Sequence, residues 1–167
     1  MIRFSAQGPR VVVGIDGSEC SRDALVFAAG EARMRGIPLH VVTTYRPEIV
    51  GPAIVEVIDH REDFAAMLRE TLAKCAGQLA GLEVHADVVL AHPALCLEAA
   101  SRDATLLVVG SRGHGGLARM VLGSTSHAVV QHASCPVVVV HRAPVPAEPH
   151  AVPDQRMGSD VIDVLSL

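Results

Sequence analysis

Five short apolar runs, separated by segments of helical length, constrain the fold of this chain more than any other feature. The runs cover residues 11–15, 39–44, 84–90, 105–109 and 137–140, and each has the length of a strand. Three of them are nearly continuous in apolar residues instead of alternating with polar ones, which is typical of strands that helices cover on both faces. Since such strands belong to parallel sheets, the sequence predicts a five-stranded parallel sheet.

The segments between the runs carry helix signals. Ser18 is placed to cap a helix that ends at Gly36. A second helix before Gly81 is predicted by apolar residues at spacings of three and four, namely Phe64, Leu68, Leu72, Cys75 and Leu79. Shorter helices fit residues 94–102 and 124–133. The alternation of strands and helices predicts an α/β fold with a single open doubly wound sheet, helices on both faces and right-handed crossovers.

We expect one domain over residues 1–142, followed by a tail over residues 143–167. The chain has 167 residues, which is the size of one ordinary domain. Half of its residues are hydrophobic and only 19% are charged, so it is too apolar to remain disordered. The tail has a different composition, which favours an extended, polyproline-like chain. Its four closely spaced prolines are Pro144, Pro146, Pro149 and Pro153.

The composition argues against several classes of protein. The net charge is -4 and the few aromatic residues are scattered, so a nucleic-acid partner is not expected. The first apolar run stops at Asp16, before a signal-peptide core would be complete, and no stretch approaches the roughly 18 apolar residues of a membrane helix. The four cysteines form no C-x-x-C motif and are expected to be reduced thiols. We therefore expect a soluble, cytoplasmic protein without a membrane partner.

The strongest chemical signal lies between the fourth predicted strand and the last predicted helix. This segment contains Gly110, then Gly113 after two residues, then Gly123 after nine more. It ends in three hydroxyl residues, which are Ser124, Thr125 and Ser126. The connection over residues 111–122 is much longer than the roughly 2–6 residues usual between a strand and a helix, and such long loops are usually functional.

The residues of this segment are suited to binding phosphate. Glycines let a backbone approach a ligand closely, and the first turn of a helix presents unpaired N–H groups. The hydroxyl groups, with Arg112 and Arg119, add donors and positive charge. The segment therefore predicts a phosphate-binding loop, and the alternative is a flexible loop followed by an N-cap. A Walker A loop is excluded because Lys74 is the only lysine, and a dinucleotide fingerprint is disfavoured because residues 14–18 lack its third glycine.

Asp16 ends the first predicted strand at the carboxyl edge of the sheet. Ligands of open α/β sheets bind outside this edge, where the strand order reverses. If the first and fourth strands are neighbours there, Asp16 faces the Gly110 loop and can accept hydrogen bonds from ribose hydroxyls. The alternative role for Asp16 is to cap the first helix together with Ser18.

Taken together, these residues resemble the universal stress proteins, in their ATP-binding branch. The signature of that branch, G-2x-G-9x-G-[ST], is matched by Gly110, Gly113, Gly123 and Ser124. The resemblance covers roughly residues 9–142. It implies the strand order 3-2-1-4-5 and dimers joined through the last strand, Val137–Val140.

The resemblance also implies a role for each residue of the site. Asp16 corresponds to the aspartate that binds ribose or adenine, and the backbone of Thr44 to the group that meets adenine. Val109 and Gly110 would lie beside the nucleoside. The residues expected around the phosphates are Arg112, Gly113, Gly123, Ser124 and Thr125. Gly14 and Ser126 complete the set of expected binding residues.

The nine histidines raise the question of a metal site. His127 and His132 lie five residues apart on the last predicted helix, so they occupy different faces and would not converge on one ion. His114 lies inside the glycine loop, where phosphate contact and solvent exposure both remain open. No Ser-His-Asp or Cys-His arrangement is indicated, and the loop itself offers no carboxylate. We therefore expect no catalytic residue and no metal held by side chains alone.

Three functions remain after these exclusions. The first is a homodimeric regulatory or stress-response protein that binds ATP, with AMP or ADP as alternative ligands, and hydrolyses it slowly or not at all. It would sense or signal through occupancy of the site by the nucleotide. In that case Mg²⁺ would be held by phosphate oxygens, water and Ser124. The second is an enzyme of the same architecture that hydrolyses or transfers a phosphoryl or adenylyl group. The third is an interaction protein without a nucleotide.

Overall fold

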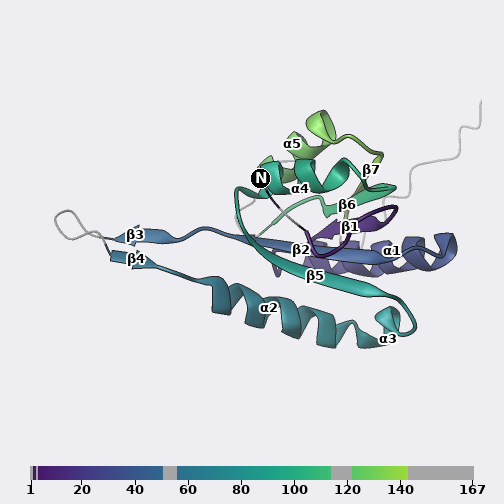
Figure 1. The fold of residues 1–167 in the computed structure, drawn as a ribbon, viewed down its shortest axis with the longest axis horizontal. Helices are drawn as coiled ribbons and strands as arrows, with labels where there is room; N and C mark the ends of the chain where they lie inside the picture. The colour runs from purple at the N-terminus through teal and green to yellow at the C-terminus, as the bar shows by residue number, and fades with distance from the viewer. Residues whose placement is uncertain (1, 3, 51–55, 114–121, 143–167) are drawn as a thin grey trace, which may run out of the picture.

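The computed structural model describes residues 2, 4–50, 56–113 and 122–142. Five parallel strands form one sheet in the order β5-β2-β1-β6-β7, as Figure 1 shows. The strands are β1 (Val11–Gly14), β2 (Leu39–Tyr45), β5 (Val84–Leu90), β6 (Leu106–Gly110) and β7 (Val137–Val140). Counted along the chain within this sheet, the order is 3-2-1-4-5, which confirms the prediction.

Helices cover both faces of the sheet (Figure 1). They are α1 (Glu19–Arg35), α2 (Arg61–Lys74), α3 (Ala76–Leu79), α4 (Pro93–Ser101) and α5 (Ser124–His132). Val11 and Val13 point into a core formed with α1 and α2, whereas Val12 points into a second core formed with α4 and α5. All three valines are fully buried, which explains why the first run is continuously apolar.

The ends of α1 follow the sequence signals. The Ser18 hydroxyl accepts a hydrogen bond from the Ser21 N–H at 3.2 Å, and Gly36 ends the helix in the left-handed conformation with φ 62°. The second predicted helix is wrong in one respect, because it is divided into α2 and α3. Cys75 leaves the helical conformation at φ -103° and ψ 13°, and Gly77 follows it as a poor helix former. Cys75 and Leu79 still pack against the core.

A small antiparallel hairpin between β2 and α2 was not predicted. It consists of β3 (Glu48–Val50) and β4 (Glu56–Ile58), which form a sheet of their own. Figure 1 shows that it extends away from the main sheet, beyond the carboxyl end of β2. The hairpin therefore starts and ends beside the edge where the functional site was expected.

Some predictions lie outside the described residues, namely the proline-rich tail over 143–167, His114 and Arg119. In the described part of the chain, every helix is too short or too polar to cross a membrane. The four cysteines are free thiols, as predicted. Cys75 and Cys96 are buried, and Cys20 and Cys135 are half-buried.

Candidate functional site

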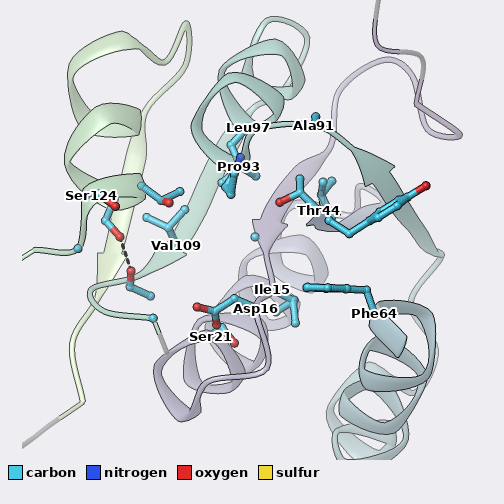
Figure 2. Close-up of a pocket in the computed structure, with 18 of the residues that line it drawn as sticks. Ile15, Asp16, Ser21, Thr44, Phe64, Ala91, Pro93, Leu97, Val109 and Ser124 are labelled. Carbon is cyan, nitrogen blue, oxygen red and sulfur yellow. Dashed lines mark hydrogen bonds between the residues drawn. The ribbon is translucent and has the colours of Figure 1, made fainter. Parts of the chain in front are cut away.

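A cavity of about 950 Å³ opens at the carboxyl edge of the sheet, where β1 and β6 lie side by side and the strand order reverses. Its volume lies within the range of roughly 300–1,000 Å³ that is usual for small-molecule sites. All of the predicted binding residues line it: Gly14, Asp16, Thr44, Val109, Gly110, Arg112, Gly113, Gly123, Ser124, Thr125 and Ser126. Figure 2 shows Ser124 and Phe64 on opposite sides of this space, with Asp16 between them.

The first turn of α5 forms one end of the cavity. Gly123 is the N-cap and supplies no side chain to the N–H groups that follow. The N–H of Gly123 itself donates to the Ser111 carbonyl at 2.8 Å. Because the first N–H groups of a helix have no partner within it, those of Ser124 and Thr125 are available to an anion, and the positive end of the helix dipole favours one.

Hydrogen bonds inside the protein hold the two ends of the glycine loop together. The Ser126 hydroxyl donates to the Gly110 carbonyl at 2.6 Å, and the Ser111 N–H donates to the Val140 carbonyl at 2.8 Å. Ser126 is buried, and its hydroxyl proton is used in this bond. Ser126 therefore lines the cavity as predicted, but its geometry favours joining α5 to β6 over donating to a ligand.

Asp16 and Gly113 face each other across the ends of β1 and β6. The Asp16 Oδ1 accepts a hydrogen bond from the Ser18 N–H at 3.0 Å, which shapes the turn before α1. The Asp16 Oδ2 points at Gly113, so closely that a Cβ on Gly113 would overlap it. In the described part of the chain this oxygen has no hydrogen-bond partner. Both roles considered for Asp16 are thus compatible, because one oxygen serves the turn and the other faces the cavity.

Thr43 fixes the segment that carries Asp16. It is buried, and its hydroxyl donates to the Ile15 carbonyl. The Ile15 N–H donates to the Val42 carbonyl at 2.9 Å. These bonds join the end of β1 to β2 immediately before Asp16. Sequence reasoning passed over Thr43 and favoured Thr44, although a threonine inside a buried apolar run is a sign that its hydroxyl has an internal partner.

The wall opposite α5 is apolar and was missed in the sequence. The rings of Tyr45 and Phe64 lie 6.3 Å apart at an angle of 35°. Other apolar residues that line the cavity are Ile15, Val42, Ala91, Pro93 and Leu97, of which Pro93 and Leu97 lie on α4, the helix that packs against α5. Sequence reasoning used Phe64 only as the start of the apolar spacing of the second helix and gave it no role at the site. The available signal was the scarcity of aromatic residues, since the chain has one Tyr, three Phe and no Trp.

Positive charge lies at both ends of the cavity. The exposed Arg112 belongs to the glycine loop, and its carbonyl accepts a hydrogen bond from the Ser18 hydroxyl at 3.4 Å. Arg46 and His60 line the cavity on the side of the hairpin.

Within the described residues, no three His, Cys, Asp or Glu side chains are grouped so that they could hold a metal ion.

The fold and the site together define a doubly wound α/β domain in which the N-terminus of α5 and the acidic Asp16 line one cavity. The chain belongs to the universal stress protein family, whose family model matches residues 9–141. This result confirms the predicted resemblance to the family.

Individual relatives extend the comparison. A universal stress protein of Mycolicibacterium smegmatis is 36% identical over 139 residues, which cover 78% of this chain and 47% of that protein. One from Mycobacterium tuberculosis is 32% identical over 167 residues, covering 86% of this chain and 51% of the relative. The chain thus spans about half the length of the curated relatives it matches.

Solved structures share the fold. A universal stress protein in complex with cAMP has a TM-score of 0.60 and 29% identity, over 82% of this chain and 98% of that chain. The universal stress protein of Archaeoglobus fulgidus in complex with dAMP has a TM-score of 0.56 over 81% of this chain and 99% of that chain. Its identity of 24% supports a likeness of fold alone.

Proposed function

We propose that this protein is a regulatory protein that binds an adenine nucleotide, ATP in the first place, and hydrolyses it slowly or not at all. One observation carries the proposal: a single cavity joins the free N–H groups of the α5 N-terminus to an apolar, partly aromatic wall, with Asp16 between them. A nucleotide has groups that match these features in the same order, namely its phosphates, its ribose and its base.

The cavity suggests an orientation for the nucleotide. The phosphates lie at Gly113, Gly123 and the first turn of α5, where Arg112 adds positive charge. The ribose hydroxyls donate to the Asp16 Oδ2. The base lies against the wall of Tyr45 and Phe64. Gly14, Thr44, Val109 and Gly110 form the floor between these groups, and a Mg²⁺ ion would be held through the phosphate oxygens and Ser124.

The scarcity of carboxylates among the described residues of the cavity favours binding of a nucleotide over its hydrolysis. Phosphoryl transfer needs acidic metal ligands and a group that positions the attacking nucleophile. Among the described residues that line the cavity, Asp16 is the only one with a carboxylate, and one of its oxygens is engaged by Ser18. This arrangement supports a nucleotide sensor more than the enzyme considered as the alternative. The relative solved with cAMP adds support for adenine as the base.

Native mass spectrometry of freshly purified protein, followed by calorimetric titration, tests the proposal. We expect a co-purified adenine nucleotide or, from protein stripped of ligand, saturable binding of ATP. AMP, ADP and cAMP should be titrated beside ATP, and GTP serves as the control for the base. Absence of binding by all four adenine nucleotides would instead support the interaction protein without a nucleotide.

Replacing Asp16 with alanine is expected to weaken the binding of ATP and AMP by about 1.5–3 kcal/mol, because charged hydrogen bonds to the ribose are lost. Inorganic triphosphate should bind nearly as before. Asp16→Asn is the matched control, since its amide oxygen retains an acceptor for the Ser18 N–H while the charge is removed. Equal losses for nucleotides and triphosphate, measured by calorimetry, would mean that Asp16 mainly shapes the loop.

We also propose a homodimer joined through β7. Of the described strands, β7 pairs with β6 alone, so its outer edge is unpaired. Its four valines are half-buried, and an apolar edge strand tends to associate unless something covers it. Antiparallel pairing with a second copy covers this edge and closes at a dimer.

Replacing Val138 and Val140 with lysine is expected to convert this dimer into a monomer, because charged side chains on β7 disfavour pairing of its open edge. Both valines also pack against the core that contains α1, so the substitution costs stability as well. Deletion of residues 143–167 should leave the dimer intact, as expected if the domain ends at residue 142. Light scattering measures both results, and thermal unfolding checks that the lysine variant is folded. A monomeric unsubstituted protein, or a dimer lost only with the tail, would contradict the role of β7.

A further inference from the structure

A polar cluster around the buried His40 lies away from the cavity, beneath the segment that precedes β1. We call residues 2 and 4–8 of this segment the N-terminal arm. The N–H and the hydroxyl of Ser5 both donate to Asp87 Oδ2 on β5, at 2.8 and 3.0 Å. The Nε2 of His40, on β2, lies 2.8 Å from the same oxygen. One carboxylate oxygen therefore joins the arm to two strands of the sheet.

His40 makes this cluster sensitive to protons. Its side chain is 0% exposed, and Nδ1 has no hydrogen-bond partner among the described residues. The ring of Phe4, from the arm, meets the ring of His40 edge-on, with centroids 5.4 Å apart. A neutral His40 satisfies the cluster, because Nε2–H donates to Asp87. A second proton would create an N–H at Nδ1 that is buried without an acceptor.

The charged groups around His40 come from several elements. Burial lowers the pKa of His40 below its ordinary value; Asp87 opposes this effect, and Arg10 and His85 add to it. Arg10 is itself buried, and its guanidinium donates to the carbonyls of Gly8 and Ala100. Burial also raises the pKa of Cys96, on α4, to about 11, and Asp87 contributes to this shift. The charged and titratable groups that act on His40 are therefore one carboxylate, one permanent cation and one histidine.

The pKa of Asp87 shifts in the direction that strengthens the cluster at neutral pH. Burial alone would raise its pKa, but the Ser5 N–H, the His40 ring and the Ser5 hydroxyl together hold it below the ordinary value. Asp87 therefore remains a carboxylate at pH values above its ordinary pKa of 3.8.

We propose that Ser5, His40 and Asp87 form a latch that holds the N-terminal arm at neutral pH and releases it when His40 is protonated. The docked arm disfavours the charged ring, and the released arm exposes His40 to water. The released state therefore binds the proton more readily. By linkage, docking weakens by up to about tenfold for each pH unit below 6.5, until the pH reaches the lower pKa of the docked state. Docking is strongest above pH 6.5.

Release of the N-terminal arm affects the cavity through the apolar core between them. Ile2 and Phe4 pack against the same apolar cluster that contains Val42, Leu97 and Val109. These three residues also line the cavity. Their packing is therefore supported from behind by the docked arm, and acid removes that support.

A fluorescence titration tests the latch. The chain has no tryptophan, so Phe4→Trp provides a single reporter on the arm. We expect its emission to shift to longer wavelength between pH 7.5 and 4.5, with a midpoint below 6.5, while the far-ultraviolet circular dichroism remains constant. In Phe4→Trp/His40→Gln the shift should disappear, because the glutamine amide can donate to Asp87 but gains no proton. Phe4→Trp/His132→Gln is the control and should titrate like the single variant, because His132 is exposed on α5 and is not among the groups that shift the pKa of His40.

Hydrogen exchange provides a second measurement on the unsubstituted protein. The amides of the arm should lose protection between pH 7.5 and 4.5, after correction for the intrinsic exchange rate, while those of β1 keep theirs. The proposal is wrong if the arm stays protected, if the His40→Gln variant titrates like its parent, or if circular dichroism is lost at the same pH as the emission shift.

Discussion

Replacing Gly113 with valine is expected to abolish the binding of adenine nucleotides while the protein remains folded. Even a single Cβ at this position would overlap the Asp16 Oδ2, so the loop and the carboxylate cannot keep their places. Gly123→Val is expected to have the same effect for a different reason. An added Cβ there meets the Ser111 carbonyl at an ordinary 3.6 Å, so the branched side chain fits but occupies the anion end of the cavity.

Calorimetric titration of ATP measures both effects. A loss of at least about 100-fold, or roughly 2.7 kcal/mol, is expected for each variant. Gly30→Ala is the control, because an added Cβ at Gly30 meets nothing within 4 Å and lies far from the cavity on α1. Unchanged affinity in both valine variants would contradict the assignment of the phosphate site, provided that thermal unfolding shows them to be folded.

Replacing Gly110 with alanine is expected to destabilise the fold itself. The new Cβ would lie 2.8 Å from the carbonyl carbon of Cys20 and 2.9 Å from its oxygen. Both atoms belong to the backbone of α1 and cannot move aside, so the end of β6 must separate from the helix. Overpacking of this kind costs typically about 1–3 kcal/mol.

Chemical denaturation measures this cost, and it should appear as a lower midpoint with an unchanged slope. Gly123→Ala is the matched control, since its Cβ makes only ordinary contacts. Equal stability of the Gly110→Ala variant and the unsubstituted protein would show that β6 and α1 are less tightly packed than the structure indicates. Gly110 and Gly123 belong to one motif, but Gly110 is thus expected to act in packing and Gly123 in ligand binding.

The main sheet could be predicted because the burial of each strand is reflected in its residue types. Val11, Val12 and Val13 are buried from both sides, so a continuous apolar run is the only pattern compatible with their position. The glycine loop could be predicted for a similar reason, since close approach at Gly110 and Gly113 excludes a side chain. In both cases a local physical requirement is visible in the residue type.

The apolar wall could not be predicted because it depends on long-range geometry, whereas the hairpin was missed for a local reason. Phe64 satisfies the spacing of an amphipathic helix whether it faces the core or the cavity, and only the packing of α2 on the sheet decides between these. Tyr45 lies just beyond the run at 39–44, so its position at the cavity follows from where β2 ends. The hairpin lies in a segment containing Pro47 and Pro52, which favoured a loop.

The central place of β1 has a consequence for the synthesis of the chain. β1 is made first, and its neighbour β2 follows soon after, but the opposite edge of β1 is paired by β6, which begins only at Leu106. A growing chain therefore carries an apolar strand with one open edge until most of the domain has left the ribosome, and such edges attract other chains. The helix at the proposed ligand site, α5, emerges later still. Truncated chains that end before Ser124 would lack this helix, so binding of ligand would distinguish completed domains from interrupted ones.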